Sequence, residues 1–274
     1  MKRLPSLFVS HGSPMMALEP SPARDFLSGL GARLPRPRAI LVLSAHHDAA
    51  HEGGHITVTA SPKPPTIHDF GGFPQALFDM RYPAPGDPAL ARRIVDLFAD
   101  HGLAVAADAD RGLDHGAWVP LSLIYPDADI PVVQLSVASG APPEWHYALG
   151  RALAPLRDDG ILIIGSGSMT HNLRAFRSAR PPIDAPAPEW VTGFTDWVAE
   201  RFAAGAVDDV LHAVERAPHG RDNHPTPDHI LPLFAAMGAG TDADGLHAAR
   251  LHDSITYAIL AMDVYAFGEG AAAL

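Results

Sequence analysis

Cysteine is absent from this chain of 274 residues. The protein therefore has no disulfide bond, no thiolate ligand and no cysteine nucleophile, and any metal ion must be held by His, Asp or Glu. Long apolar runs are absent too: none reaches the roughly 18 residues that a membrane-spanning helix needs. The first apolar run is broken by Pro5 and ends at Ser10, which is too short for the core of a secretory signal peptide. We therefore expect a cytoplasmic protein with no membrane partner.

Basic side chains are scarce relative to acidic ones. The sequence has 20 Lys and Arg against 31 Asp and Glu, which gives a net charge of −11 at pH 7. Because nucleic acids and anionic membranes bind basic surfaces, neither is expected as a partner. Hydrophobic residues make up 47% of the chain, which is enough for a large buried core.

Short apolar runs rich in β-branched residues predict buried strands. They lie at Leu7–Ser10, Ala39–Ser44, Ile130–Val137 and Ile161–Gly165, with a weaker candidate at Ile56–Thr59. Helical patterns lie between and after them, at Asp87 to His101, Pro143 to Asp158, Glu189–Ala204 and Thr226 to Met237. Ile255–Phe267 is ambiguous by periodicity and is assigned to a strand. This alternation predicts an α/β fold, with residues 1–274 forming a single domain around a central mixed or mainly parallel sheet flanked by helices.

Histidine is enriched, with 16 residues in the chain, and several histidines follow predicted strands. Leu7–Ser10 ends at His11, Ala39–Ser44 runs into His46, and Ile161–Gly165 is followed by His171. In open α/β sheets, ligand sites form beyond the carboxyl ends of the strands. Since neutral imidazole is the commonest metal ligand, we expect a metal site at these strand ends.

Other histidines have weaker or competing interpretations. Neighbouring side chains on a strand face opposite ways, so only one of His46 and His47 can face the crevice. His47, His51 and His55 recur at helical spacing, but the two glycines after Glu52 disfavour a helix, so these three are predicted to lie in a solvated loop.

The polar segments later in the chain leave alternatives open. The turn between Gly165 and His171 could cradle a phosphate, but it matches neither nucleotide-binding glycine pattern, so no nucleotide cofactor is expected. His224 and His229 bracket a Pro-Thr-Pro-Asp segment, and the local pattern alone does not choose between them as ligands. His115 follows Asp114 in a polar cluster that is equally compatible with a simple turn.

Short motifs recur in order along nearly the whole chain, from about residue 8 to about residue 240, and together they resemble one known family. The chain is similar to the class III extradiol ring-cleavage dioxygenases, in the branch of the bacterial and plant DOPA 4,5-dioxygenases. The segments that carry the resemblance are 10–15, 35–37 with 44–46, 66–74, 82–86, 113–116, 125–133, 165–167 with 171–174, and 225–233.

The resemblance implies roles for five histidines. His11, His46 and His229 match the three metal ligands of the family. His171 matches a histidine near the metal that acts as an acid/base, and that some descriptions count as a fourth ligand. His115 matches a second active-site histidine that contacts the substrate or the oxygen-derived intermediate.

The expected activity is cleavage of a catechol ring with O2 by a non-haem, metal-dependent dioxygenase. Related enzymes complete a face of two histidines and one carboxylate around Fe(II), whereas an all-histidine set is also typical of zinc. We therefore expect Fe(II), with Zn(II) as the alternative metal, and no organic cofactor. A zinc hydrolase that uses His171 or Asp114 as its base, or a non-catalytic metal-binding protein, remains open. The particular catechol and the oligomeric state are not predicted, although Arg174 and Arg221 are candidate cations for an acidic substrate.

Overall fold

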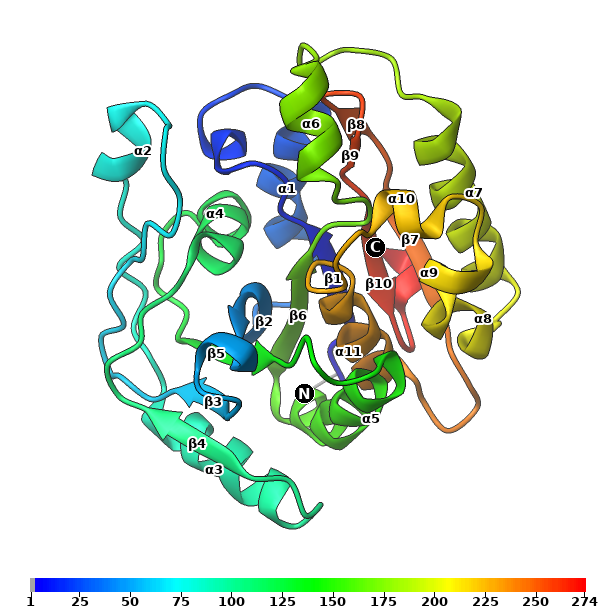
Figure 1. The fold of residues 1–274 in the computed structure, drawn as a ribbon. Helices are drawn as coiled ribbons and strands as arrows, with labels where there is room; N and C mark the ends of the chain where they lie inside the picture. Colours follow the sequence, from blue (N-terminus) through cyan, green and yellow to red (C-terminus); the bar gives the residue numbers. More distant parts are fainter. Residues whose placement is uncertain (1–2) are drawn as a thin grey trace.

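The structure is a computed structural model that describes residues 3–274, and one eight-stranded sheet organises it (Figure 1). The strand order is β4-β3-β5-β2-β6-β1-β10-β7, and two further strands pair separately as β8-β9. The strands are β1 (Ser6–Ser10), β2 (Ala39–Asp48), β3 (Ile56–Thr59), β4 (Val105–Asp108), β5 (Val132–Val137), β6 (Ile161–Gly167), β7 (Ala248–His252), β8 (Ile255–Thr256), β9 (Leu260–Ala261) and β10 (Val264–Phe267).

The centre of this sheet is parallel and its edges contain antiparallel pairs. Strands β5, β2, β6 and β1 run parallel to one another, and β3 runs parallel to β4. The pairs β3–β5, β1–β10 and β10–β7 are antiparallel. The predicted architecture, a mixed and mainly parallel sheet in one α/β domain, is confirmed.

The helix after Asp87 begins at a capping residue that the sequence supplies. Asp87 accepts hydrogen bonds from the backbone N–H groups of Ala89 and Leu90, and Pro88 follows it at the first helical position. The α-helices are α1 (Pro22–Arg33), α2 (Gln75–Asp79), α3 (Pro88–Ala99), α4 (His115–Ile124), α5 (Pro143–Leu153), α6 (Leu173–Ala179), α7 (Glu189–Ala203), α8 (Val207–Leu211), α9 (Ala213–Arg216), α10 (Gly220–Asn223) and α11 (Leu231–Gly240). Short 3₁₀ helices lie at Pro14–Ala17, Ala49–His51, Ala154–Asp159 and Ala271–Ala273.

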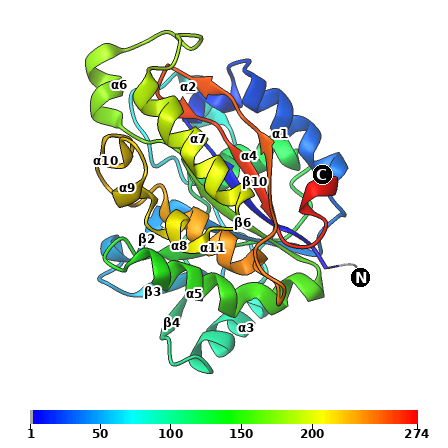
Figure 2. The ribbon, with the colours of Figure 1, turned by 90° about the vertical axis from the view of Figure 1, so that its right-hand side faces the viewer.

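Helices cover both faces of the sheet. In β2, Ile40 and Val42 pack in the cluster that contains α1 and α4, whereas Leu41 and Leu43 pack in the cluster that contains α3 and α5. Viewed from the β7 edge, α1 and α4 lie on the other side of the strands from α5 and α11 (Figure 2). Because both faces are buried, the central strands are continuous apolar runs. No helix of residues 3–274 is long and apolar enough to cross a membrane.

Most predicted elements are present, but one helix boundary was wrong. The helix predicted from Thr226 begins only at Leu231, and residues 225–230 form turns. Pro232 explains the difference, since a proline is tolerated in the first turn of a helix but not five or six residues inside it. His229 therefore lies in a turn rather than in the first turn of a helix.

The final apolar segment is also more broken than predicted. Ile255–Phe267 contains three short strands, β8, β9 and β10, rather than one. Tyr257 and Ala258 interrupt it with φ values of +53° and +61°, in the left-handed region that strands do not adopt. Helices α1, α2, α4, α6, α8, α9 and α10 and strands β4 and β7 were not predicted.

Candidate metal centre and active site

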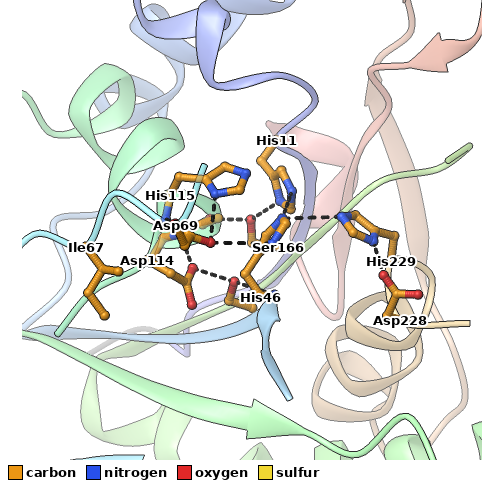
Figure 3. Close-up of polar contacts among 12 residues, drawn as sticks. His11, His46, Ile67, Asp69, Asp114, His115, Ser166, Asp228 and His229 are labelled. Carbon is orange, nitrogen blue, oxygen red and sulfur yellow. Dashed lines mark hydrogen bonds and ion pairs between the residues drawn. The ribbon is translucent and has the colours of Figure 1, made fainter. Parts of the chain in front are cut away.

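Three histidines from distant parts of the chain meet at the carboxyl ends of the central strands (Figure 3). His11 follows β1, His46 lies near the end of β2, and His229 lies in the turn before α11. The Nε2 atom of His46 is 3.1 Å from Nε2 of His11 and 3.3 Å from Nε2 of His229. The structure thus brings together the three residues that the sequence singled out as ligands.

The spacing of these nitrogens fits a shared metal ion. Two nitrogens that each lie about 2.1 Å from one ion, at an angle of roughly 90–110°, are about 3.0–3.4 Å apart. The two Nε2–Nε2 distances, 3.1 Å and 3.3 Å, fall in this interval. Without a cation between them, three imidazole nitrogens would direct unshared electron pairs at one another. The donor set therefore fits a divalent metal ion.

Hydrogen bonds to the other ring nitrogens select the tautomer that ligation requires. Nδ1 of His11 lies 3.0 Å from Oγ of Ser166, and because that hydroxyl donates to the carbonyl of Gly116, it accepts from His11. Nδ1 of His229 donates to Oδ2 of Asp228. Both rings thus carry their proton on Nδ1 and present the Nε2 lone pair to the cluster, as metal-binding histidines do.

Burial keeps the rings of His11 and His46 neutral. The pKa of His11 is held well below its ordinary value by burial and by the neighbouring imidazoles, of which His46 acts most strongly. The pKa of His46 is lowered by burial and then by His115 and His229. Since only the neutral ring can bind a metal, these lowered pKa values favour the metal-binding form of His11 and His46.

His46 and His47 take opposite sides of β2, as the strand alternation predicts. His46 joins the cluster, while His47 is fully buried on the other side with Nε2 2.7 Å from Oγ1 of Thr57. The prediction of a solvated loop is therefore wrong for His47, because β2 continues through a bulge to Asp48. His51 and His55 are exposed, in agreement with that prediction.

Asp69 lines the same site, although the sequence did not single it out. Its carboxylate accepts hydrogen bonds from Nδ1 of His115, at 2.9 Å, and from the backbone N–H of His115, at 3.0 Å. It also lies 3.5 Å from Nδ1 of His46. Burial alone would raise the pKa of Asp69, but the bonds from His115 outweigh burial and lower it. The one signal in the sequence was its place in the 66–74 motif.

His115 is the first residue of α4, which is capped by the side chain of Asp114. Its ring centroid is 3.9 Å from that of His46 and 5.4 Å from that of His11. Because Asp69 accepts the proton of Nδ1, Nε2 of His115 remains available to a ligand. His115 is therefore part of a helix start rather than of a simple turn.

His171 stacks on His229, with ring centroids 3.4 Å apart and 9° between the planes. Its backbone N–H donates to the carbonyl of Asn223, and no described residue hydrogen-bonds to its ring. Burial, followed by the nearby His229, lowers the pKa of His171. The ring of His171 is therefore neutral at neutral pH.

His224 lies outside the histidine cluster that His229 joins. Its Nε2 donates to the carbonyl of Met169 at 2.9 Å, and burial lowers its pKa to about 4. With Nε2 engaged in the core beside Phe194, His224 acts as a buried structural residue.

A pocket of about 570 Å³ opens beside the histidine cluster. Its walls include the side chains of His46, His115, His171 and His229, with aromatic and aliphatic side chains opposite them. Neither Arg174 nor Arg221 is among the residues that line it, but Arg177 is.

Asp114 does not face this pocket. It is completely buried and accepts hydrogen bonds from Ser44, at 2.7 Å, and from Gln134. Burial raises the pKa of Asp114, and the carboxyl group is enclosed by its partners. The structure therefore gives no support to Asp114 as the base of a hydrolase.

The fold and the histidine-lined pocket define a non-haem, metal-dependent dioxygenase, and comparison with known families agrees. The LigB family, described as the catalytic LigB subunit of aromatic ring-opening dioxygenase, matches residues 5–268. The chain belongs to this family, whose members are oxidoreductases.

Individual relatives cover nearly the same region. The chain is 46% identical over 240 residues to a 4,5-DOPA dioxygenase extradiol of Escherichia coli K12, a match that covers 86% of this chain and 85% of the relative. It is 42% identical over 266 residues to the 4,5-DOPA dioxygenase extradiol of Beta vulgaris, with 96% of each chain covered. The crystal structure of an uncharacterized protein from Escherichia coli K12 superposes with a TM-score of 0.76 at 35% identity, covering 97% of this chain and 100% of the other. The matches favour the extradiol dioxygenase and neither the zinc hydrolase nor the non-catalytic protein.

Proposed function

We propose that this protein opens the ring of a catechol with O2, and that His11, His46 and His229 bind the Fe(II) ion that the reaction requires. The observation that carries this proposal is the approach of two Nε2 atoms to Nε2 of His46, at 3.1 Å and 3.3 Å, beside a pocket of about 570 Å³. A pocket of this volume admits an aromatic ring with a substituent.

The metal supplies the chemistry that no side chain of this protein provides. When bound, a ferrous ion acts as a Lewis acid for the two catechol oxygens and as the redox centre that allows O2 to react with the ring. His11, His46 and His229 would hold the ion, and the pocket beside them would admit the substrate and O2. The same three imidazoles also suit Zn(II), so the metal must be identified by experiment.

His171 is proposed as the acid/base rather than as a fourth ligand. A histidine nitrogen binds an ion close to the plane of its own ring. The rings of His171 and His229 are stacked, with centroids 3.4 Å apart and 9° between their planes, so the two rings would not direct their nitrogen lone pairs at one point. The neutral ring of His171 can instead accept the proton of a catechol hydroxyl.

His115 is proposed to hold the substrate from the opposite side. With its Nδ1 proton directed at Asp69, its Nε2 atom presents a lone pair and accepts a hydrogen bond from the second catechol hydroxyl. A proton taken up there can return to the ring-opened product. Asp69 would stabilise the ring in its protonated form, as the carboxylate does in other Asp–His pairs.

The activity is tested with an aerobic spectrophotometric screen of Fe(II)-loaded protein against a panel of catechols, with protein loaded with Zn(II) and anaerobic samples as controls. Because the two relatives above are named for DOPA, DOPA is the first member of the panel. We expect yellow ring-opened products that need both Fe(II) and O2. Turnover that persists with Zn(II) or without O2 would refute the proposal.

The role of His171 is tested with His171→Ala and a control, His101→Ala, at an exposed helix end. Loss of a general acid/base lowers turnover about 10²–10⁴-fold, and we expect His171→Ala to show this with full metal content. The control should match the wild type. Loss of bound metal in parallel with activity would instead identify His171 as a fourth ligand.

A further inference from the structure

One wall of the pocket is formed by α6, a helix with no buried residues. Leu173, Phe176 and Arg177 line the pocket, and these positions are related as i, i+3 and i+4, which places them on one face of the helix. Arg174 lies on the same helix but not among the lining residues. The two arginines therefore differ in one respect that matters here: Arg177 lines the pocket and Arg174 does not.

Arg177 is the only Lys or Arg among the residues that line this pocket. Its guanidinium makes no hydrogen bond or ion pair with any residue in the described range 3–274. The only carboxylate that lines the pocket, Asp69, is already bonded to His115. An anionic group that enters this pocket therefore meets a cation with no competing partner, in a protein whose net charge is −11.

Specific contacts hold α6 over the pocket although it buries none of its own residues. The side chain of Asn172 accepts from the backbone N–H of Ala175 at 2.9 Å and donates to the carbonyl of Asp222 at 2.7 Å. The ring of Phe176 meets the edge of Tyr257, with centroids 5.5 Å apart. The position of Arg177 is thus set by contacts at the start and in the middle of this short helix.

Tyr257 is itself held in an unusual backbone conformation. Its φ is +53°, and that of Ala258 is +61°, a pairing that costs conformational energy in non-glycine residues. Its backbone N–H donates to the carbonyl of Ile183 at 2.9 Å, and its hydroxyl donates to Glu19. These bonds fix an aromatic wall that both lines the pocket and supports α6.

We propose that Arg177 binds a carboxylate on the side chain of the substrate and makes the pocket selective for catechols with an anionic substituent. The inference rests on the proposed function, since it takes the histidine cluster as the place where the diol binds. The ring would lie between the histidines and the aromatic walls, with its substituent directed at α6. A planar guanidinium can hold a carboxylate through two parallel hydrogen bonds.

The test uses 3-(3,4-dihydroxyphenyl)propionate and its primary amide, which differ in charge but hardly in shape. Their Kd values are measured by anaerobic calorimetry on metal-loaded protein, so that binding is read without turnover. The variants are Arg177→Gln and the matched control Arg174→Gln, on the same helix. A hydrogen-bonded charge at a partly exposed site is worth about 10-fold in affinity.

We expect Arg177→Gln to weaken binding of the acid about 10-fold and to leave the amide within about 2-fold, while Arg174→Gln changes neither. Equal losses for acid and amide, equal losses in both variants, or no binding of either probe to the wild type would overturn the proposal. Ring cleavage in air is recorded separately. Selective binding of the acid without any cleavage would support the role of Arg177 but refute the proposed ring-cleavage function.

Discussion

Replacing Asp228 with Asn tests whether the carboxylate behind His229 serves a bound metal. Asp228 accepts the Nδ1 proton of His229, and this bond outweighs burial to lower the pKa of Asp228 well below its ordinary value. Asn keeps an acceptor oxygen in the same place but removes the negative charge. The ring should therefore keep its orientation while its Nε2 atom becomes a weaker donor to the metal.

The size of the effect follows from which part of the interaction is lost. Partners that orient and polarise a metal-bound histidine are worth about 10- to 100-fold in metal affinity. Because Asp228→Asn preserves the geometry, we expect the lower limit, about 10-fold or about 1.4 kcal/mol. Asp228→Ala loses orientation as well, and we expect about 100-fold, or about 2.7 kcal/mol.

The assay is an anaerobic competition of the protein with a chelator of known affinity for Fe(II). Asp244→Asn is the matched control, since Asp244 makes a 3.0 Å contact with His247, an exposed histidine outside the cluster. Circular dichroism checks that each variant is folded. The reasoning fails if Asp228→Asn binds the metal as tightly as the wild type, or if Asp244→Asn weakens it equally.

Three further substitutions test the fold that supports the site. His146 is fully buried, with Nε2 accepting from the N–H of Ala138 and Nδ1 donating to the carbonyl of Pro142, and burial lowers its pKa to about 4. In the unfolded chain His146 is protonated near pH 6.5, whereas in the folded protein it stays neutral down to about pH 4. The free energy of unfolding should therefore decrease by about 3 kcal/mol as the pH falls from about 6.5 to about 4. Denaturant melts of His146→Gln should lack that part of the pH dependence. If the free energy of unfolding changes with pH equally in the variant and the wild type, His146 is not the cause of this loss of stability. A Cβ added at Gly167 would lie 2.2 Å from the carbonyl oxygen of His229, so Gly167→Ala should destabilise the protein by about 1–3 kcal/mol and weaken metal binding in a chelator competition. Gly29 lies in helix α1 with no atom within 4 Å of an added Cβ, and Gly29→Ala should stabilise the protein by about 0.5–1 kcal/mol in a thermal melt with metal affinity unchanged.

The sequence predicts the central sheet well because strands that are buried on both faces appear as continuous apolar runs. The run Ala39–Ser44 is apolar without interruption, and its side chains enter the core alternately on the two sides of β2. The same burial obscures helical periodicity in two helices: α4 was not predicted, and α11 was predicted with its start five residues too early. All ten residues of α11 and nine of the ten in α4 are buried, so neither helix has the polar face that produces a helical period.

The ends of strands reveal two of the three candidate ligands, but tertiary contacts decide the rest. His11 and His46 follow from their positions after β1 and in β2. Tertiary contacts distinguish His229 from His224: His229 approaches His46, whereas Nε2 of His224 donates to the carbonyl of Met169, 55 residues away. Asp69 lies in an irregular loop and is separated from His115 by 46 residues in the sequence, so no local sequence pattern predicts their contact.

The central claim is tested most directly by a crystal structure of the Fe(II)-loaded protein with anomalous diffraction collected at the iron edge. We expect one iron peak about 2.0–2.2 Å from the Nε2 atoms of His11, His46 and His229, with the remaining positions facing the pocket. An iron peak elsewhere, or an ion enclosed by protein ligands on every side, would contradict this account.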